Sequence, residues 1–170
     1  MIENVNQLKI EEARKSWVIV FICLLLVLLS VFTLTLRWSW SRTVKIDAEK
    51  YDIAFPREFR YAVNCKLENN EYVFTGYACM SQEYTAWADC WVVLHCLITD
   101  EYVRIPTKAG LLDNRATYEI NDGIIYGRAG ISARIMTDKL TDKPESYELC
   151  FIYKSNGYNY LIGTGQPAFG

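Results

Sequence analysis

The feature that most constrains this chain is a run of twenty residues without a charged side chain, from Trp17 to Leu36. As an α-helix with a rise of about 1.5 Å per residue, such a run spans about 30 Å, the thickness of the hydrocarbon core of a bilayer. A cleaved signal peptide has an apolar region of about 7 to 15 residues, followed by small residues at the cleavage site. Here Arg37-Trp38-Ser39-Trp40 follows the run. The sequence therefore predicts an uncleaved helix that spans a lipid bilayer.

Basic residues lie on both sides of the run, with a slight excess after it. By itself, the positive-inside rule would favour a cytoplasmic carboxyl side. Large domains, however, translocate largely regardless of their charge, and an early apolar segment after a short tail commonly acts as a signal-anchor. We therefore expect a cell-membrane protein that crosses once, with the N-terminus cytoplasmic and the C-terminal domain extracytoplasmic.

Around this run the chain divides into a short N-terminal tail (1–16), the transmembrane helix (17–36), a juxtamembrane tether (37–42) and one domain (43–170). Aromatic residues make up 14% of the chain, which is enough to supply a packed core. The net charge of −2 provides no basic surface for nucleic acid, so no nucleic-acid partner is expected.

After Thr43 the apolar residues recur with a period of two, as in half-buried strands. The apolar residues Val44, Ile46 and Ala48, for example, alternate with charged ones. Further strands are predicted at residues 60–67, 71–80, 90–98, 101–105, 115–120, 130–136, 146–153 and 158–163. No amphipathic helix is expected after the apolar run. Strands at this spacing predict an all-β domain, an antiparallel β-sandwich or alternatively a barrel, behind a single N-terminal transmembrane helix.

Two of the predicted hairpins carry turn signals. Asn69-Asn70 suits the positive φ of a tight turn between two strands, and Ser155-Asn156-Gly157 joins the last two strands. These signals indicate that neighbouring strands pair in an antiparallel manner.

Five cysteines fall in the predicted strands and one, Cys23, in the transmembrane helix. The pairing cannot be deduced from spacing alone. Cys79 and Cys90 flank the loop 80–89 and are the candidate disulfide, since an extracytoplasmic domain permits such bonds. Cys96 with Cys150, or with Cys65, is a second option. The alternative is that all five are buried free thiols.

The search for catalytic and metal-binding residues yields little. The one histidine, His95, lies in the most apolar predicted strand and could act as a base only beside a nucleophile such as Cys65 or Cys150. A buried histidine with a satisfied ring nitrogen is the favoured interpretation. No ligand pair has zinc-knuckle spacing, and His95 and Cys96 should point to opposite faces of a strand. We therefore expect no metal, no cofactor and no enzymatic activity.

Tyrosine and tryptophan are abundant in the domain, and four of them form a candidate binding surface. Tyr84 and Trp87 lie in the loop between two predicted strands, while Tyr158 and Tyr160 share one face of the last hairpin. Amphipathic aromatic side chains stack on sugars and anchor protein partners. The competing interpretation is ordinary cross-strand packing.

Several short motifs follow one another along the chain in a recognisable order. They are Thr75-Gly76-Tyr77-Ala78, Trp91-Val92-Val93-Leu94, Tyr102, Pro106-Thr107, Arg115 and Gly130-Ile131-Ser132-Ala133-Arg134-Ile135. In this order the chain resembles, over about residues 70–165, the small β-sandwich domains attached to membrane anchors or membrane glycosyltransferases in Gram-positive bacteria of the clostridial type. The resemblance implies a cell-envelope accessory protein with no catalytic residues to carry over.

Taken together, the sequence predicts a single-pass, membrane-anchored, non-enzymatic envelope protein whose β-domain binds a partner protein or a surface glycan. One alternative is a scaffold subunit of a larger membrane complex. The other is a membrane-tethered hydrolase or thiol enzyme that uses His95.

Overall fold

The computed structural model of the chain describes residues 2–40, 42–83, 89–155 and 157–169, with side chains except at 2–16, 37–40 and 158. The chain divides into two compact units, Met1–Ser41 and Arg42–Gly170. Each unit is described by itself below.

The first unit is the helix α1, Ile2–Trp40. Within it, Trp17–Leu36 is the one helical segment among the described residues that is long and apolar enough to cross a membrane. None of this segment is buried. Its three hydroxyl groups donate to carbonyl oxygens of the preceding turn, at 2.8–2.9 Å, from Ser30, Thr33 and Thr35. Because these donors are satisfied within the helix, they do not oppose burial in lipid.

The second unit, the β-domain, contains two sheets, one of which is curled like half of a barrel. The six-stranded sheet has the order β1-β6-β5-β9-β10-β2, and the four-stranded sheet has the order β3-β4-β8-β7. The strands are β1 Val44–Ile46, β2 Asp52–Ile53, β3 Phe59–Glu68, β4 Glu71–Met80, β5 Asp89–Cys96, β6 Glu101–Arg104, β7 Thr107–Leu111, β8 Gly130–Met136, β9 Tyr147–Ser155 and β10 Tyr158–Pro167. All neighbours pair antiparallel except β2 and β10, which are parallel.

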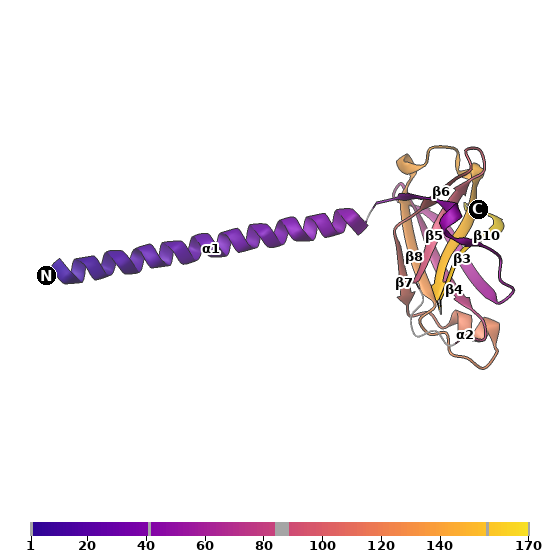
Figure 1. Ribbon diagram of the computed structural model, residues 1–170, viewed down its shortest axis with the longest axis horizontal. Helices are drawn as coiled ribbons and strands as arrows, with labels where there is room; N and C mark the ends of the chain where they lie inside the picture. Colours follow the sequence, from indigo (N-terminus) through magenta and orange to yellow (C-terminus); the bar gives the residue numbers. More distant parts are fainter. Residues whose placement is uncertain (1, 41, 84–88, 156, 170) are drawn as a thin grey trace. The chain divides into compact units, whose positions relative to one another are not determined.

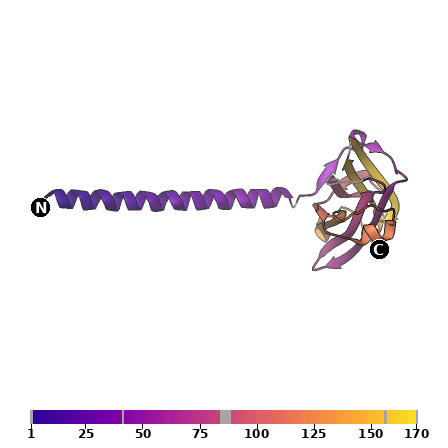
Figure 2. The same ribbon diagram turned by 90° about the horizontal axis from the view of Figure 1, so that it is seen from below.

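The strands of the β-domain form two layers (Figures 1 and 2). Side chains from both sheets pack into one main core. The alternation of each strand sends every second residue into this core: Val92, Leu94 and Cys96 of β5 enter it, whereas Val93 faces the other way. Aromatic rings fill its centre, with the Phe59 and Phe151 centroids 5.4 Å apart. The largest fully buried side chains are Tyr153, Phe59, Phe74, Phe151, Leu94, Ile105, Ile152, Leu161 and Ile162.

Two further clusters cover the outer faces of the sheets. On the four-stranded sheet, Tyr77 and Cys79 pack against Ala116 and Tyr126 of the connection between β7 and β8. On the six-stranded sheet, Val93, Cys150, Ile152 and Leu161 pack against residues of the β1–β2 segment. The β-domain is thus layered beyond its two sheets, and these outer layers carry the candidate sites.

The expectation of a strand at residues 115–120 is wrong. These residues form the helix α2, Arg115–Ile120, which ends at Asn121 with φ 50°. In six residues, the alternating pattern of a strand and the i, i+4 pattern of a helix are hard to distinguish. Ala116 and Ile120, four positions apart, both pack in the cluster around Tyr77. Packing against the outer face of the sheet therefore favours the helix.

The other predicted strands correspond to observed ones, while β2 and β7 are strands that the sequence did not reveal. The Asn69-Asn70 turn has the positive φ values expected of it, 48° and 67°. β7 follows Pro106 and contains Gly110 with φ 72°, so it lacks a regular alternation. Short or interrupted strands of this kind are held by their neighbours and leave little local pattern.

Candidate functional sites

The predicted aromatic surface is described only in part. Tyr84 and Trp87 lie outside the described residues, as does the side chain of Tyr158. Tyr160 is opposite Tyr153 in the β9–β10 pair, half-buried, and packs against the main core. Of the four residues, Tyr160 therefore contributes to packing.

The connection that carries Tyr84 and Trp87 leaves the four-stranded sheet beside another connection. The backbone N–H of Gln82 donates to Asp122 Oδ2 at 3.0 Å and to the hydroxyl of Tyr126 at 2.8 Å. Both acceptors belong to the β7–β8 connection, which contains α2. We call this part of the β-domain, residues 81–82 and 112–129, the α2 end (Figure 1).

Side-chain hydrogen bonds fix the β7–β8 connection. The Tyr77 hydroxyl donates to Glu119 at 2.6 Å, and the N–H of Tyr126 donates to Thr117 Oγ1 at 2.8 Å. Arg115 donates to both carboxylate oxygens of Asp113 through its side chain. The pKa of Asp113 lies below its usual range, chiefly because of this hydrogen-bonded guanidinium.

Three large apolar side chains project from this connection into solvent. Leu112 is 85% exposed, Tyr118 79% and Ile125 73%. Single exposed apolar residues are common on protein surfaces. Three of them on one short connection that is anchored by hydrogen bonds make the α2 end a candidate docking surface.

The predicted disulfide between Cys79 and Cys90 is not present. All six cysteines are free, and all six are among the described residues. Cys79 packs on the outer face of the four-stranded sheet with Tyr77 and Tyr126, whereas Cys90 faces the main core. The two sulfurs thus lie on different sides of β4, which is why flanking one loop does not bring them together.

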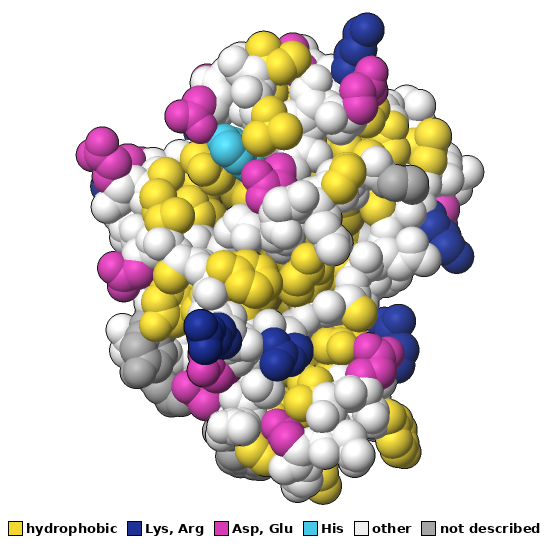
Figure 3. All heavy atoms as spheres, turned by 90° about the vertical axis from the view of Figure 1, so that its right-hand side faces the viewer, with side chains coloured by type: hydrophobic (Ala, Val, Ile, Leu, Met, Phe, Trp, Pro, Cys, Tyr) yellow, Lys and Arg dark blue, Asp and Glu magenta, His cyan; other side chains and the backbone are white. Residues whose placement is uncertain are grey.

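His95 lies near the end of β5, on the outer face of the six-stranded sheet. Its register partners are Tyr102 of β6 and Glu148 of β9. The Tyr102 ring stacks on the imidazole with centroids 4.0 Å apart and planes 2° from parallel. The histidine reaches the surface with acidic side chains beside it (Figure 3). The apolar sequence around His95 suggested a buried histidine, but the residue is partly exposed and lies outside the main core.

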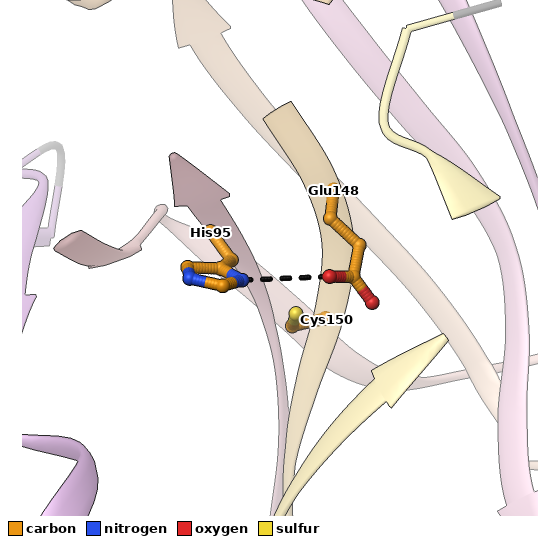
Figure 4. Close-up of side chains that lie close together, drawn as sticks. All are labelled: His95, Glu148 and Cys150. Atoms are coloured by element: carbon orange, nitrogen blue, oxygen red, sulfur yellow. Dashed lines mark hydrogen bonds and ion pairs between the residues drawn. The ribbon is translucent and has the colours of Figure 1, made fainter. Parts of the chain in front are cut away.

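Both ring nitrogens of His95 face carboxylates. Nε2 lies 2.8 Å from Asp100 Oδ1, and Nδ1 lies 3.4 Å from Glu148 Oε2. Cys150, two residues after Glu148 on β9, points to the same face (Figure 4). A ring nitrogen of His95, a carboxylate oxygen of Glu148 and the Cys150 sulfur all lie within 4.8 Å of one another. These residues form what we call the His95 cluster.

The structure brings Cys150 to His95 but leaves Cys65 on β3 of the other sheet, beside the main core. Cys150 is 1% exposed, and burial together with the Glu148 charge raises the pKa of its thiol to about 12. A cysteine nucleophile must be a thiolate that the substrate can reach. The His95 cluster as described therefore lacks both requirements of a thiol enzyme.

Sequence reasoning singled out His95 and Cys150 but missed Glu148 and the role of Asp100. Glu148 joins the cluster only because β9 pairs with β5 in the register that puts it opposite His95. The alternation of apolar residues tells which face of each strand is buried, but it does not tell which distant strand lies opposite His95. Asp100 could have been found, since it follows His95 by five residues in a predicted turn.

No family model matches this chain, and neither a curated protein nor a solved structure matches it. The resemblance to envelope β-domains therefore stays a prediction.

Proposed function

We propose that this chain is a single-pass membrane protein whose extracytoplasmic β-sandwich binds a partner protein without catalysing a reaction. The observation that carries this proposal is the α2 end, where Leu112, Tyr118 and Ile125 are exposed on a hydrogen-bonded connection. In this proposal, Trp17–Leu36 anchors the chain in the cell membrane and the domain belongs to the cell envelope.

Anchoring is supported by the composition and surroundings of the apolar segment. Its large side chains are all exposed in the isolated chain, and its hydroxyls bond to its own carbonyls. Exposing so many apolar side chains to water would be unfavourable by about 1.5–3 kcal/mol for each large one, and a bilayer removes this cost.

A partner protein is favoured over a surface glycan by the kind of side chain that is exposed. Two of the three, Leu112 and Ile125, are aliphatic, and aliphatic anchors fill apolar pockets of protein partners. Sugar recognition relies on flat aromatic rings and polar hydrogen-bonding groups. A glycan is thus the second outcome of the test below.

The partner is tested by site-specific photo-crosslinking in native membranes. A photoreactive phenylalanine analogue replaces Tyr118 in the full chain, and the matched control carries it at Leu67, which is exposed in β3 and away from the α2 end. We expect one protein adduct from position 118, lost when Leu112 and Ile125 are changed to Ser, and none from position 67. A glycan adduct would show that the partner is a surface glycan and not a protein. Adducts from both positions alike would overturn a specific surface at the α2 end.

The same membranes separate a binding module from a scaffold subunit. If the domain binds through the α2 end, then the adduct persists when Trp17–Leu36 is replaced by an unrelated apolar helix. An adduct that depends on this segment would instead indicate a complex assembled within the membrane. Orientation is tested in intact cells, where external protease should degrade residues 42–170 and leave the N-terminal tail protected.

A further inference from the structure

We propose that His95, Glu148 and Cys150 form a binding site for a divalent metal ion of the zinc type, with a fourth coordination position open to solvent. This inference is independent of the proposed function. It concerns the outer face of the six-stranded sheet near the last residues of β5, whereas the α2 end lies beyond the first residues of that strand. The donor set of imidazole nitrogen, carboxylate oxygen and thiolate sulfur is one that zinc uses in proteins.

The first argument is the distance between Nδ1 of His95 and Oε2 of Glu148. At 3.4 Å it is longer than a good hydrogen bond between nitrogen and oxygen, which is about 2.7–3.2 Å. Two such atoms bound to one tetrahedral zinc at about 2.0–2.2 Å each lie about 3.4 Å apart. The separation therefore matches one edge of a coordination tetrahedron. The Cys150 sulfur lies within 4.8 Å of a ring nitrogen of His95 and a carboxylate oxygen of Glu148, and it needs to approach by about 1 Å.

The second argument is how His95 is held. When Nε2 carries the proton and donates it to Asp100 at 2.8 Å, Nδ1 presents a lone pair toward Glu148 and Cys150. Metal-bound histidines commonly donate their other ring N–H to a carboxylate in this way. Asp100 adopts φ 56°, a backbone conformation that most side chains avoid, and in that conformation its carboxylate reaches the ring. The Tyr102 ring, stacked at 4.0 Å, fixes the plane of the imidazole.

The third argument is a β-bulge that holds the Glu148 carboxylate. The register between β10 and β9 shifts between Gly163 and Pro167. In this irregular stretch, the N–H of Gly165 donates to Glu148 Oε1 at 2.6 Å, which leaves Oε2 directed at His95. A backbone donor thus orients the carboxylate ligand, as outer hydrogen bonds do around metal sites.

The bulge also supplies space. Gly163 lies opposite Cys150, and a Cβ at this position would be 3.2 Å from Glu148 Oε1. A glycine here leaves the Glu148 carboxylate in place, because no Cβ crowds its Oε1. Bulges are over-represented next to functional sites because they re-aim nearby groups.

The burial of the ligands indicates an open rather than a closed site. The His95 and Glu148 side chains are 13% and 18% exposed, whereas Cys150 is 1% exposed. Three protein ligands with access for water are typical of zinc sites that bind an exchangeable fourth ligand. On binding, a metal–sulfur bond forms, the Cys150 thiol proton passes to solvent, and the sulfur keeps its electron pair. A carboxylate in the set favours zinc or cobalt over copper(I), which prefers soft ligands alone.

The test uses the full chain in detergent, purified without a histidine tag and freed of metal with a chelator. Zn²⁺ is titrated in competition with a chromogenic chelator, and Co²⁺ serves as the spectroscopic probe. We expect one ion per chain and, with Co²⁺, the near-ultraviolet thiolate charge-transfer band together with the visible absorption of a tetrahedral centre. Absence of stoichiometric binding, or binding without the thiolate band, would overturn the proposal and leave His95 as a hydrogen-bonding partner of two carboxylates.

Variants assign the ligands. Cys150→Ser should abolish the thiolate band, and His95→Gln and Glu148→Gln should each weaken Zn²⁺ binding at least tenfold, within the range of about 10–100-fold seen even for outer ligands. Cys65→Ser is the matched control, a domain cysteine in the other sheet, and should bind as the wild type does. If Cys150→Ser does not fold, the Co²⁺ spectrum of the wild type and the Zn²⁺ affinity of Glu148→Gln still test the site. Unchanged affinity in both His95→Gln and Glu148→Gln would refute the site.

Discussion

The His95 cluster and the α2 end lie toward opposite ends of β5 and are built in different ways. In the His95 cluster, polar groups are placed by strand register, with Tyr102, His95 and Glu148 side by side on three strands. At the α2 end, an irregular connection is held by hydrogen bonds and presents apolar side chains outward. A site placed by strand register depends on residues that are distant in sequence. The sequence of a connection between strands can change without altering the sheets. The first arrangement suits fixed coordination geometry, and the second suits adaptable contact with a partner.

The largest expected effect concerns the protonation of the Cys150 thiol in the His95 cluster. Since the pKa of Cys150 is raised to about 12, compared with about 8.5 for a free thiol, its thiolate fraction at pH 8 falls by roughly a thousandfold or more. In the folded, metal-free chain, Cys150 should react with iodoacetamide at least that much more slowly than after denaturation. Peptide mapping by mass spectrometry measures the rate at each cysteine.

Cys65 provides the internal comparison for that experiment. Burial raises the pKa of Cys65 only to about 11, and the residue is partly exposed. It should therefore react before Cys150, Cys79 and Cys90. If Cys150 reacted first, then it would be the accessible nucleophile of a thiol enzyme, and the contrast between a coordination site and a binding surface would fail.

The next effect tests whether the α2 end can be disturbed alone. A Cβ on Gly130, at the start of β8, would lie 2.6 Å from the backbone oxygen of Leu111 and 3.0 Å from Asp113 Cβ. Overpacking of this kind costs about 1–3 kcal/mol, and the Gly130→Val variant should reach the upper part of that range. Urea unfolding measures the loss. Gly127→Ala is the control, since its nearest neighbour would be an ordinary 3.6 Å from the new Cβ.

The two regions should respond differently to this variant. We expect Gly130→Val to reduce crosslinking from position 118 while Co²⁺ binding at the His95 cluster persists. Equal loss of both activities would show that the β7–β8 connection and the far end of β5 are coupled through the sheets.

A smaller effect is expected from Tyr77→Phe, which removes the hydroxyl that donates to Glu119 at 2.6 Å. One hydrogen bond of this kind contributes about 0.5–1.5 kcal/mol to stability. The ring stays in place on the outer face of the four-stranded sheet, so the apolar packing is unchanged. Hydrogen exchange should show faster opening of α2 with little change in β5 and β9. A uniform increase throughout the domain would mean that the connection is not an independent layer.

The same contrast explains what the sequence could and could not predict. Alternation and turn residues predicted β4, β8 and the Asn69-Asn70 turn because those signals are local. The helix α2 was mistaken for a strand because six residues satisfy both periods and a packing contact decides between them. Glu148 was not visible as a partner of His95 because strand register places it there, and the N–H of Gly165 that holds Glu148 comes from a bulge. Only the candidate ligands themselves, His95 and Cys150, were visible in the sequence.

The smallest expected effect is a pH dependence confined to the α2 end. The Arg115 guanidinium lowers the pKa of Asp113 in the folded chain below its value in the unfolded chain. A carboxyl with a depressed folded pKa contributes stability that is fully present above its unfolded pKa, near 4, and is lost as the pH falls through the folded value. Arg115 is 55% exposed, so solvent screens the pair and its contribution should stay under about 1 kcal/mol. Comparing wild type with Asp113→Asn by urea unfolding, we expect a small stability difference at pH 6 that shrinks as the pH falls below about 4. A difference that grew toward acid pH would have the wrong sign for this ion pair and would point to another group holding the β7–β8 connection.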